Sequence, residues 1–228
     1  KPVSQVQESS VQQEDSVPVK KVDSVKVAKT QPLTYKILVP FNYRLCNPDT
    51  IINRNWVELY KDGKDYYVGK ARYGIEMRED MCSSTIPTYL AEKRNTILFV
   101  NQLPIKKGKV KIADIAFSDS TYLEPGSVRN FTFAGKHYKL EAKAQGESQL
   151  KNYTLLLNGE RIVREARVDA ASFALLFAGD LDGDGKLDLV LSLPRDYEEL
   201  RVALFLSSCA PPGLQIGKVA EIEDDFSC

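Results

Sequence analysis

The stretch SFALLFAGDLDGDGKLDLVLSL, residues 172–193, places an acidic, glycine-containing segment between two strongly apolar runs. The first run is built mainly from Phe, Leu and Ala, and the second from Leu and Val. Short apolar runs joined by a turn are typical of paired β-strands. The stretch therefore predicts a β-hairpin that carries four carboxylates at its turn.

The four carboxylates follow a regular spacing. Asp180, Asp182 and Asp184 stand at the first, third and fifth loop positions, and Asp188 stands at the ninth. Calcium takes six to eight oxygen ligands, and alternating side chains of a coiling loop can converge on it. Lys186 would offer only its backbone carbonyl, since its ammonium opposes a cation. We expect a calcium site made by Asp180, Asp182, Asp184, Lys186 and Asp188; the alternative is an acidic turn without metal.

The string GDLDGDGKLDLV, residues 179–190, resembles the Asp-x-Asp-x-Asp-Gly-x-x-Asp calcium loops of FG-GAP and VCBS-type repeats and of the integrin propeller. The resemblance covers residues 171–191 and implies a loop that joins two antiparallel strands around a structural calcium. The motif occurs once, whereas a propeller would repeat it. An EF-hand or dockerin loop would close with a bidentate carboxylate at its twelfth position, which is Leu191 here.

Turn signals divide the remainder of the chain into short strands. Hairpin turns are indicated at Asp62-Gly63, at 134–136 and at Asn158-Gly159, because these residues supply the backbone conformations that tight turns need. The pattern between 74 and 95 is weak, with one helical turn expected at 88–93, and 41–55 is expected to be a loop. Strands are expected at 34–39, 56–60, 66–71, 96–100, 109–115, 131–133, 137–142, 152–157, 160–163, 172–178, 186–193, 201–206 and 216–222.

These elements predict a mostly β fold, with antiparallel sandwich-like sheets built from hairpins. Residues 33–228 form the β-rich region, either as one sandwich or as two small units divided near 144–150. Residues 1–32 are polar and low in complexity, and they bury too little to offset their ordering entropy. We expect a disordered tether there. It resembles the spacer after the lipidated cysteine of bacterial surface lipoproteins, which implies a lipid anchor upstream; a solvated tail fits equally well.

Charge and cysteine usage narrow the class of protein. The 31 basic and 31 acidic residues cancel, so no net field favours nucleic acid or an anionic membrane. No apolar run reaches the roughly 18 residues of a transmembrane helix. The four widely spaced cysteines suit disulfides in an oxidising compartment, with Cys46–Cys82 and Cys209–Cys228 as the favoured pairs. These observations indicate an extracytoplasmic protein; four buried thiols in a cytosolic protein are the alternative.

Candidate catalytic and ligand-binding residues are few. His137 lies on an expected strand without a nucleophile motif, so a surface histidine is the default interpretation. Glu76, Glu79 and Asp80 could supply a glycosidase-like carboxylate pair, although spacing alone cannot identify one. An aromatic-rich hairpin could stack on sugars if exposed, but a core role is favoured. Its members are Trp56, Tyr60, Tyr66, Tyr67 and Tyr73.

We therefore expect a calcium-stabilised, extracytoplasmic binding or structural protein, located in the periplasm, on the outer surface or outside the cell. Its partner would be a protein or a glycan, and no catalytic residue is assigned. The alternative is a secreted hydrolase, or a carbohydrate-binding accessory domain, that acts on polysaccharide and carries a structural calcium.

Overall fold

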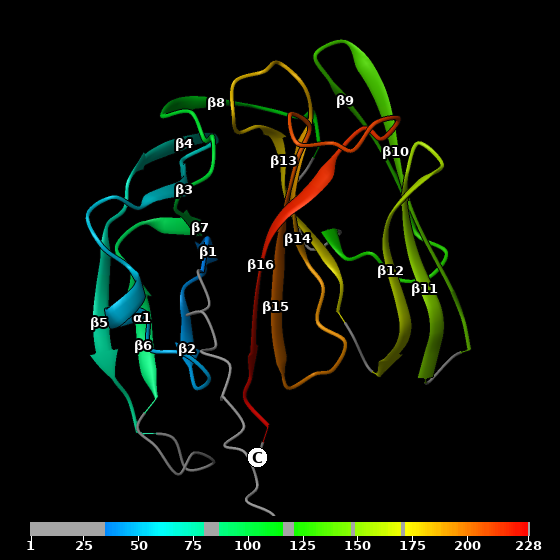
Figure 1. Ribbon diagram of the computed structural model, residues 1–228. Helices are drawn as coiled ribbons and strands as arrows, with labels where there is room; N and C mark the ends of the chain where they lie inside the picture. Colours follow the sequence, from blue (N-terminus) through cyan, green and yellow to red (C-terminus); the bar gives the residue numbers. More distant parts are fainter. Residues whose placement is uncertain (1–34, 80–86, 116–120, 147–148, 170–171, 228) are drawn as a thin grey trace, which may run out of the picture. The chain divides into compact units, whose positions relative to one another are not determined.

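The computed structural model describes residues 35–79, 87–115, 121–146, 149–169 and 172–227, which fold into antiparallel β-strands and one short helix (Figure 1). This confirms the mostly β fold built from hairpins. The elements are β1 (Ile37–Leu38), β2 (Phe41–Tyr43), α1 (Pro48–Ile51), β3 (Val57–Asp62), β4 (Asp65–Lys70), β5 (Tyr73–Met77), β6 (Thr88–Glu92), β7 (Asn95–Val100), β8 (Gly108–Ile112), β9 (Val128–Phe133), β10 (Lys136–Gln145), β11 (Gln149–Leu157), β12 (Glu160–Asp169), β13 (Ala174–Asp180), β14 (Asp188–Ser192), β15 (Glu199–Leu206) and β16 (Gly217–Asp225).

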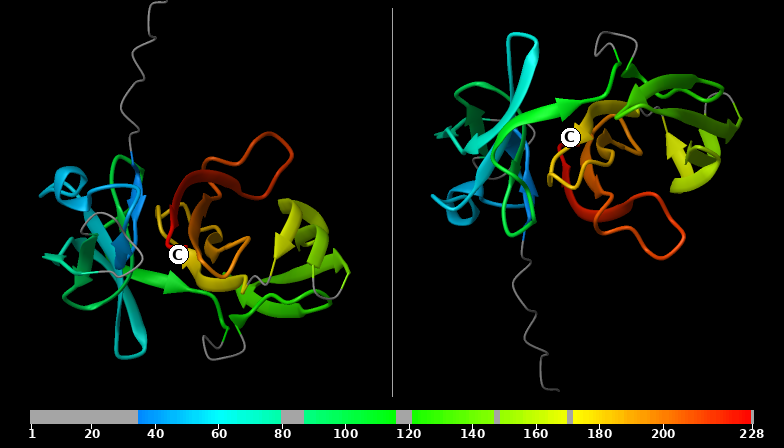
Figure 2. Two further views of the ribbon diagram at one scale, coloured as in Figure 1. Left: turned by 90° about the horizontal axis from the view of Figure 1, so that it is seen from below. Right: turned by 90° about the horizontal axis from the view of Figure 1, so that it is seen from above.

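The strands form three antiparallel sheets. The largest has nine strands in the order β1-β7-β3-β4-β8-β13-β14-β15-β16. A four-stranded sheet runs β12-β11-β10-β9, and a three-stranded sheet runs β2-β6-β5. Strand β8 joins the two halves of the largest sheet, since it pairs with β4 on one side and with β13 on the other (Figure 2). The edge strands β1 and β16 approach one another, so this sheet curls back toward closure.

Strands β13, β14 and β15 are buried on both faces. Along β15, Val202 and Leu204 enter one hydrophobic core, which they share with β1, β3, β4 and β7. The alternate residues Ala203 and Phe205 enter a second core, which they share with the four-stranded sheet. Side chains alternate between the two faces of a strand, so burial on both faces requires a continuous apolar run. This explains the uninterrupted apolar sequence at 202–206 of β15.

The hairpin turns expected from the sequence are confirmed. Asn158 and Gly159 join β11 to β12 with φ values of 51° and 85°. Ala134 and Gly135 join β9 to β10 with φ values of 48° and 76°. Two consecutive residues with positive φ match the right-handed twist of the flanking strands, which favours Asn and Gly at such turns.

Two local expectations are wrong. The segment expected to form a helical turn at 88–93 contains β6, which pairs with β2 and β5 on its two sides. The expected loop at 41–55 contains β2 and α1, where Pro48 occupies the first turn and the Asn47 side chain accepts a hydrogen bond from the Asp49 amide. The first segment is a strand because it pairs with strands that are distant in the sequence. The second segment contains a helix because the Asn47 side chain caps its first turn.

Several expectations fall on residues outside the described ranges, namely the tether at 1–32, Asp80, Cys82 and Cys228. Cys46 and Cys209 are free thiols, so the expected disulfides are not present. Residues 34–228 form one compact unit, and β10 and β11 pair with each other on either side of the segment at 144–150. Within the described ranges, no helix has the length and apolar character needed to cross a membrane.

Candidate metal centre

The acidic loop, residues 180–188, is anchored at both ends. A Cβ atom at Gly179, just before it, would lie 2.5 Å from the Lys111 carbonyl oxygen, so only glycine lets β8 and β13 approach this closely. Leu181 is buried in the first hydrophobic core, and Leu187 is buried in the second. The apolar residues of the loop therefore fix its two ends, and its carboxylates are left to face inward or to solvent.

Three carboxylates of the loop converge. Asp180, Asp182 and Asp188 each present an oxygen, and these oxygens all lie within 4.8 Å of one another. Asp188 is fully buried, whereas Asp180 and Asp182 are half-buried at the mouth of the cluster. Like charges held this closely repel one another, and the repulsion is strongest where water is excluded. The arrangement could hold a metal ion, and its donors are carboxylate oxygens alone.

Backbone amides of the loop already point toward these carboxylates. Asp180 accepts hydrogen bonds from the Gly183 amide at 2.6 Å and from the Gly185 amide at 3.0 Å. Both glycines have positive φ, 82° and 80°, which turns the chain so that its N–H groups face inward. Asp182 accepts in turn from the Asp184 amide at 3.1 Å. The glycine spacing thus serves to coil the loop around its first aspartate.

Asp188 has the most constrained position. Its Oδ2 accepts from the Leu181 amide at 2.7 Å, and its Oδ1 accepts from the Ser207 amide at 2.8 Å and the Ser207 hydroxyl at 3.1 Å. Burial, together with the charge of Asp182, raises the pKa of Asp188 to about 7 despite the hydrogen bonds from Ser207 and Leu181, which act to lower it. The hydrogen bonds therefore orient the carboxylate without compensating fully for its burial.

The fully buried carboxylates of the described chain differ in whether a basic side chain pairs with them. Among the described residues, Glu58, Asp188 and Asp224 are the carboxylates with no exposed surface. Arg94 donates to Glu58 at 2.8 Å through Nε, and the backbone and charge of Arg44 act on Asp224. No Lys, Arg or His in the described ranges forms an ion pair with Asp188. A buried charge is normally paired or coordinates a metal, and Asp188 has no basic side chain paired with it in the described chain.

The structure separates the remaining expected ligands from this cluster. The Asp184 carboxylate accepts from the Ser207 hydroxyl at 3.0 Å and from the Lys186 amide at 2.8 Å. The Lys186 ammonium lies 3.7 Å from the same carboxylate, and its side chain is largely exposed. Asp180, Asp182 and Asp188 are thus brought together, and Asp184 is linked to Asp188 through the Ser207 hydroxyl.

Two serines that the sequence did not indicate support the site from another loop. Ser207 contacts Asp184 and Asp188, and the Ser208 hydroxyl donates to Asp182. Both follow directly after β15, whose partner is β14, so strand pairing brings them to the acidic loop. The available signal was a Ser-Ser pair at the end of an apolar run, and it becomes informative only once the strand order is known.

The other candidate sites have ordinary environments. Trp56 and Tyr66 are buried, while Tyr60 and Tyr67 stack on each other at 5.7 Å, so the aromatic hairpin belongs mainly to the core. Glu76 forms an ion pair with Arg78 at 3.0 Å. His137 is exposed on β10, near the turn of the β9–β10 hairpin.

No protein family, curated protein or solved structure matches this chain. The interpretation of the acidic loop therefore depends on its own residues and geometry.

Proposed function

We propose that this chain is a calcium-stabilised, extracytoplasmic β protein with a binding or structural role, in which calcium fastens the β13–β14 hairpin to the loop after β15. The observation that carries the proposal is the convergence of Asp180 and Asp182 on the fully buried Asp188, for which the described chain supplies no basic partner. A divalent cation would neutralise these carboxylates where arginines neutralise others.

The donor set favours calcium among the common metals. Hard oxygen ligands in a flexible, irregular arrangement suit calcium, whereas zinc prefers cysteine and histidine. Calcium needs six to eight oxygens, so three carboxylates leave positions to fill. Asp184, the Lys186 carbonyl and water are the nearest candidates, as expected from the spacing of the loop. In this role the metal stabilises the fold and performs no chemistry on a substrate.

The proposed location follows from the affinity that such loops reach. Calcium sites of extracellular modules bind with dissociation constants on the order of 0.1–1 mM, which suits a calcium-rich exterior. The free thiols of Cys46 and Cys209 add no support for that location. A protein or glycan partner remains part of the proposal.

Thermal unfolding with calcium and with chelator tests the metal site. A ligand that binds only the folded state stabilises it by mass action, so 10 mM calcium should add about 1.4–2.7 kcal/mol for dissociation constants of roughly 0.1–1 mM. For a domain of this size the melting temperature should rise by about 3–10 °C. An unchanged melting temperature would refute the site, and an equal rise with magnesium would refute the choice of calcium.

A matched pair of variants separates this effect from general salt effects. Asp182→Asn removes one charge from the cluster, and its amide oxygen can still accept from the Asp184 backbone. We expect the calcium-dependent rise to disappear or to need about tenfold more calcium. Asp62→Asn removes a charge at the exposed β3–β4 turn and should leave the rise unchanged. Equal loss in both variants would contradict a site at the acidic loop.

A further inference from the structure

A cleft of about 460 Å³ opens beside the acidic loop. The four turns around it lie at the same end of the fold (Figure 1). Its size falls within the roughly 300–1,000 Å³ that small-molecule sites occupy. The β9–β10 and β11–β12 hairpins form one side of it. The acidic loop and the connection from β15 to β16 form the other side. The described lining comprises 136–138, Asn158, 186–187, Ser207 and 210–216.

The charged groups of the cleft are basic. Lys136 and Lys186 line it from opposite sides, and the exposed His137 imidazole lies next to Lys136. No Asp or Glu is among the described lining residues, but two carboxylates adjoin them: Asp184 lies 3.7 Å from the Lys186 ammonium, and Glu160 accepts from the Gln215 amide at 3.0 Å. A cleft with basic groups on two walls attracts an anionic group, and charge-assisted hydrogen bonds from ammonium groups are stronger than neutral ones.

The rest of the surface combines apolar faces with fixed amides. Leu214 is 44% exposed at the rim, beside two prolines that also line the cleft. The Tyr138 ring is held by stacking on Phe131, with ring centroids 5.6 Å apart. Asn158 donates through Nδ2 to Gln215 Oε1 at 3.0 Å, which fixes both amides at the cleft wall. Apolar faces next to oriented amides suit a sugar ring, which has a C–H face and an edge of hydroxyls.

The cleft offers an extended peptide only a short strand edge. Peptides that bind by strand addition need an unpaired strand edge. Strand β10, which forms the cleft wall at 136–138, pairs there with β9, and its pairing with β11 begins only at Leu140. Recognition here would therefore depend on side chains, and those side chains are two lysines, a histidine, a tyrosine and two amides.

We propose that this cleft binds a carboxylate-bearing oligosaccharide, with Lys136 and Lys186 pairing with its carboxylates and Tyr138 and the prolines contacting its sugar rings. The proposal rests on the proposed function as a binding protein and names the class of its partner. It requires no bound metal for the contacts that it assigns.

A titration of the full chain with three probes tests the proposal, monitored by amide chemical shifts in NMR spectra. The probes are a hyaluronan tetrasaccharide, which carries glucuronate carboxylates, the neutral N-acetylglucosamine tetramer, and a tetraglutamate peptide. We expect the acidic tetrasaccharide to bind at least about tenfold more tightly than the other two, because it alone offers both carboxylates and rings. Shifts should centre on 136–138 and 210–216.

A matched pair of lysine variants locates the site. Lys136→Gln removes an exposed ammonium from the cleft without disturbing the core, and it should weaken tetrasaccharide binding about tenfold. Lys151→Gln removes an exposed ammonium from β11, away from the cleft, and should change nothing. Equal behaviour of the two variants would overturn the assignment.

Two further outcomes of the titration would change or overturn the proposal. Tetraglutamate binding as tightly as the tetrasaccharide would replace the glycan with an acidic peptide, and absence of binding by all three probes would overturn the proposal. Calcium binding is measured by calorimetry on the same samples. Calcium binding without tetrasaccharide binding refutes the cleft proposal alone, whereas tetrasaccharide binding without calcium binding supports the cleft and refutes the metal site.

Discussion

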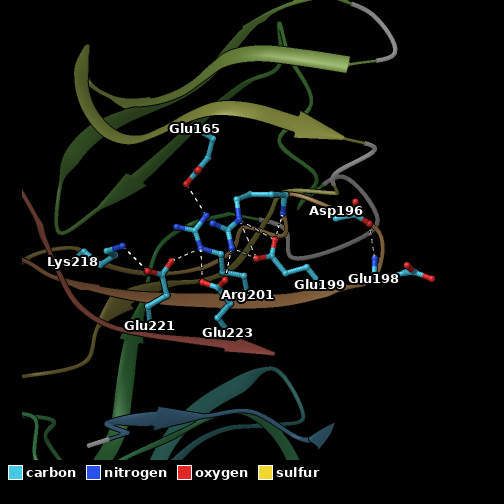
Figure 3. A network of polar contacts seen from close by, with 9 residues as sticks. Glu165, Asp196, Glu198, Glu199, Arg201, Lys218, Glu221 and Glu223 are labelled. Carbon is cyan, nitrogen blue, oxygen red and sulfur yellow. Dashed lines mark hydrogen bonds and ion pairs between the residues drawn. The ribbon is translucent and has the colours of Figure 1, made fainter. Parts of the chain in front are cut away.

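Two acidic clusters lie at opposite ends of β14 and β15, and they are neutralised differently. At one end the acidic loop has four aspartates and one lysine, whose ammonium reaches only Asp184. At the other end, around the turn from β14 to β15, four glutamates meet three basic residues (Figure 3). The basic residues there are Arg195, Arg201 and Lys218. We call this second cluster the arginine network.

The arginine network joins two sheets. Arg201 is 8% exposed and donates to Glu165 of β12 at 2.6 Å and to Glu221 of β16 at 2.6 Å. Arg195 pairs with Glu199, at the start of β15, and with Glu223. Carboxylates from two sheets thus converge on a guanidinium, which presents several donors in a rigid plane. The network is complete without any ligand.

The difference shows what each cluster does. Carboxylates of the arginine network have basic partners within the chain, because an unpaired buried charge is costly. The acidic loop instead orients its carboxylates with backbone amides and serines, and it leaves their negative charge in place. That is the arrangement expected where the neutralising charge comes from outside the chain.

Removing Arg201 should have the largest effect on stability. Arg201→Met leaves Glu165 and Glu221 near the interface between sheets without their partner, and breaking such a pair costs about 3 kcal/mol. Urea unfolding should show this loss equally in calcium and in chelator, because the network is independent of the metal.

The exposed pair of Arg167 and Asp169 on β12 supplies the control. Arg167 lies 3.0 Å from Asp169, but its side chain is 64% exposed, so Arg167→Met should cost less than about 1 kcal/mol. A loss at Arg201 as small as that at Arg167 would show that the network contributes little. A loss that calcium reverses would contradict the separation of the two clusters.

Glu199 should give the network a defined pH dependence. Burial raises the pKa of Glu199, but hydrogen bonds and charge from Arg195, with the charge of Arg201, outweigh it and hold the pKa below its usual value. Stability from its ionisation is therefore present above the unfolded pKa near 4.5 and is lost as pH falls through the folded value. Glu199→Gln should cost about 2 kcal/mol at pH 7.

Unfolding at several pH values checks this expectation. The difference between wild type and Glu199→Gln should shrink toward zero as pH falls through the lowered pKa of Glu199, since Glu199 is then protonated in the wild type too. A difference that stays constant with pH would assign the loss to packing instead of charge.

Local patterns predicted the hairpins, whereas distant pairing decided the rest of the fold. Asn158-Gly159 could be identified because positive φ at a tight turn is a property of those residues themselves. The segment at 88–93 was misassigned because its strand depends on β2, more than forty positions earlier in the chain. The order of strands in the largest sheet was equally hidden, because β8 and β13 pair across about seventy residues.

The candidate metal centre and the arginine network show the same difference between local and distant signals. Asp180, Asp182 and Asp188 could be identified because the ligand spacing is contained in one loop. Ser207 and Ser208 could not, since only the pairing of β14 with β15 brings them there. One feature of the sequence did indicate the arginine network: the charged residue Arg201 stands within the otherwise apolar segment 200–206 of β15.

Ser208 provides the smallest and most selective test of the comparison. Its exposed hydroxyl donates to Asp182, so Ser208→Ala frees that carboxylate without opening the core. Loss of such a supporting hydrogen bond should weaken calcium binding about tenfold, which is about 1.4 kcal/mol. Unfolding in chelator should change by less than about 0.5 kcal/mol, because an exposed hydrogen bond contributes little by itself.

Calorimetric titration with calcium, together with urea unfolding in chelator, separates these two effects, and Ser172→Ala serves as an exposed control outside the loop. If Ser208 only braced the fold, stability would fall equally with and without calcium. A loss confined to the calcium-bound protein would mean that the serine acts through the carboxylate that it orients. The loss at Arg201 is expected to be the same with and without calcium, because its glutamate partners need no metal ion. The acidic loop would then depend on a bound ion for its charge balance, whereas the arginine network would depend on the chain alone.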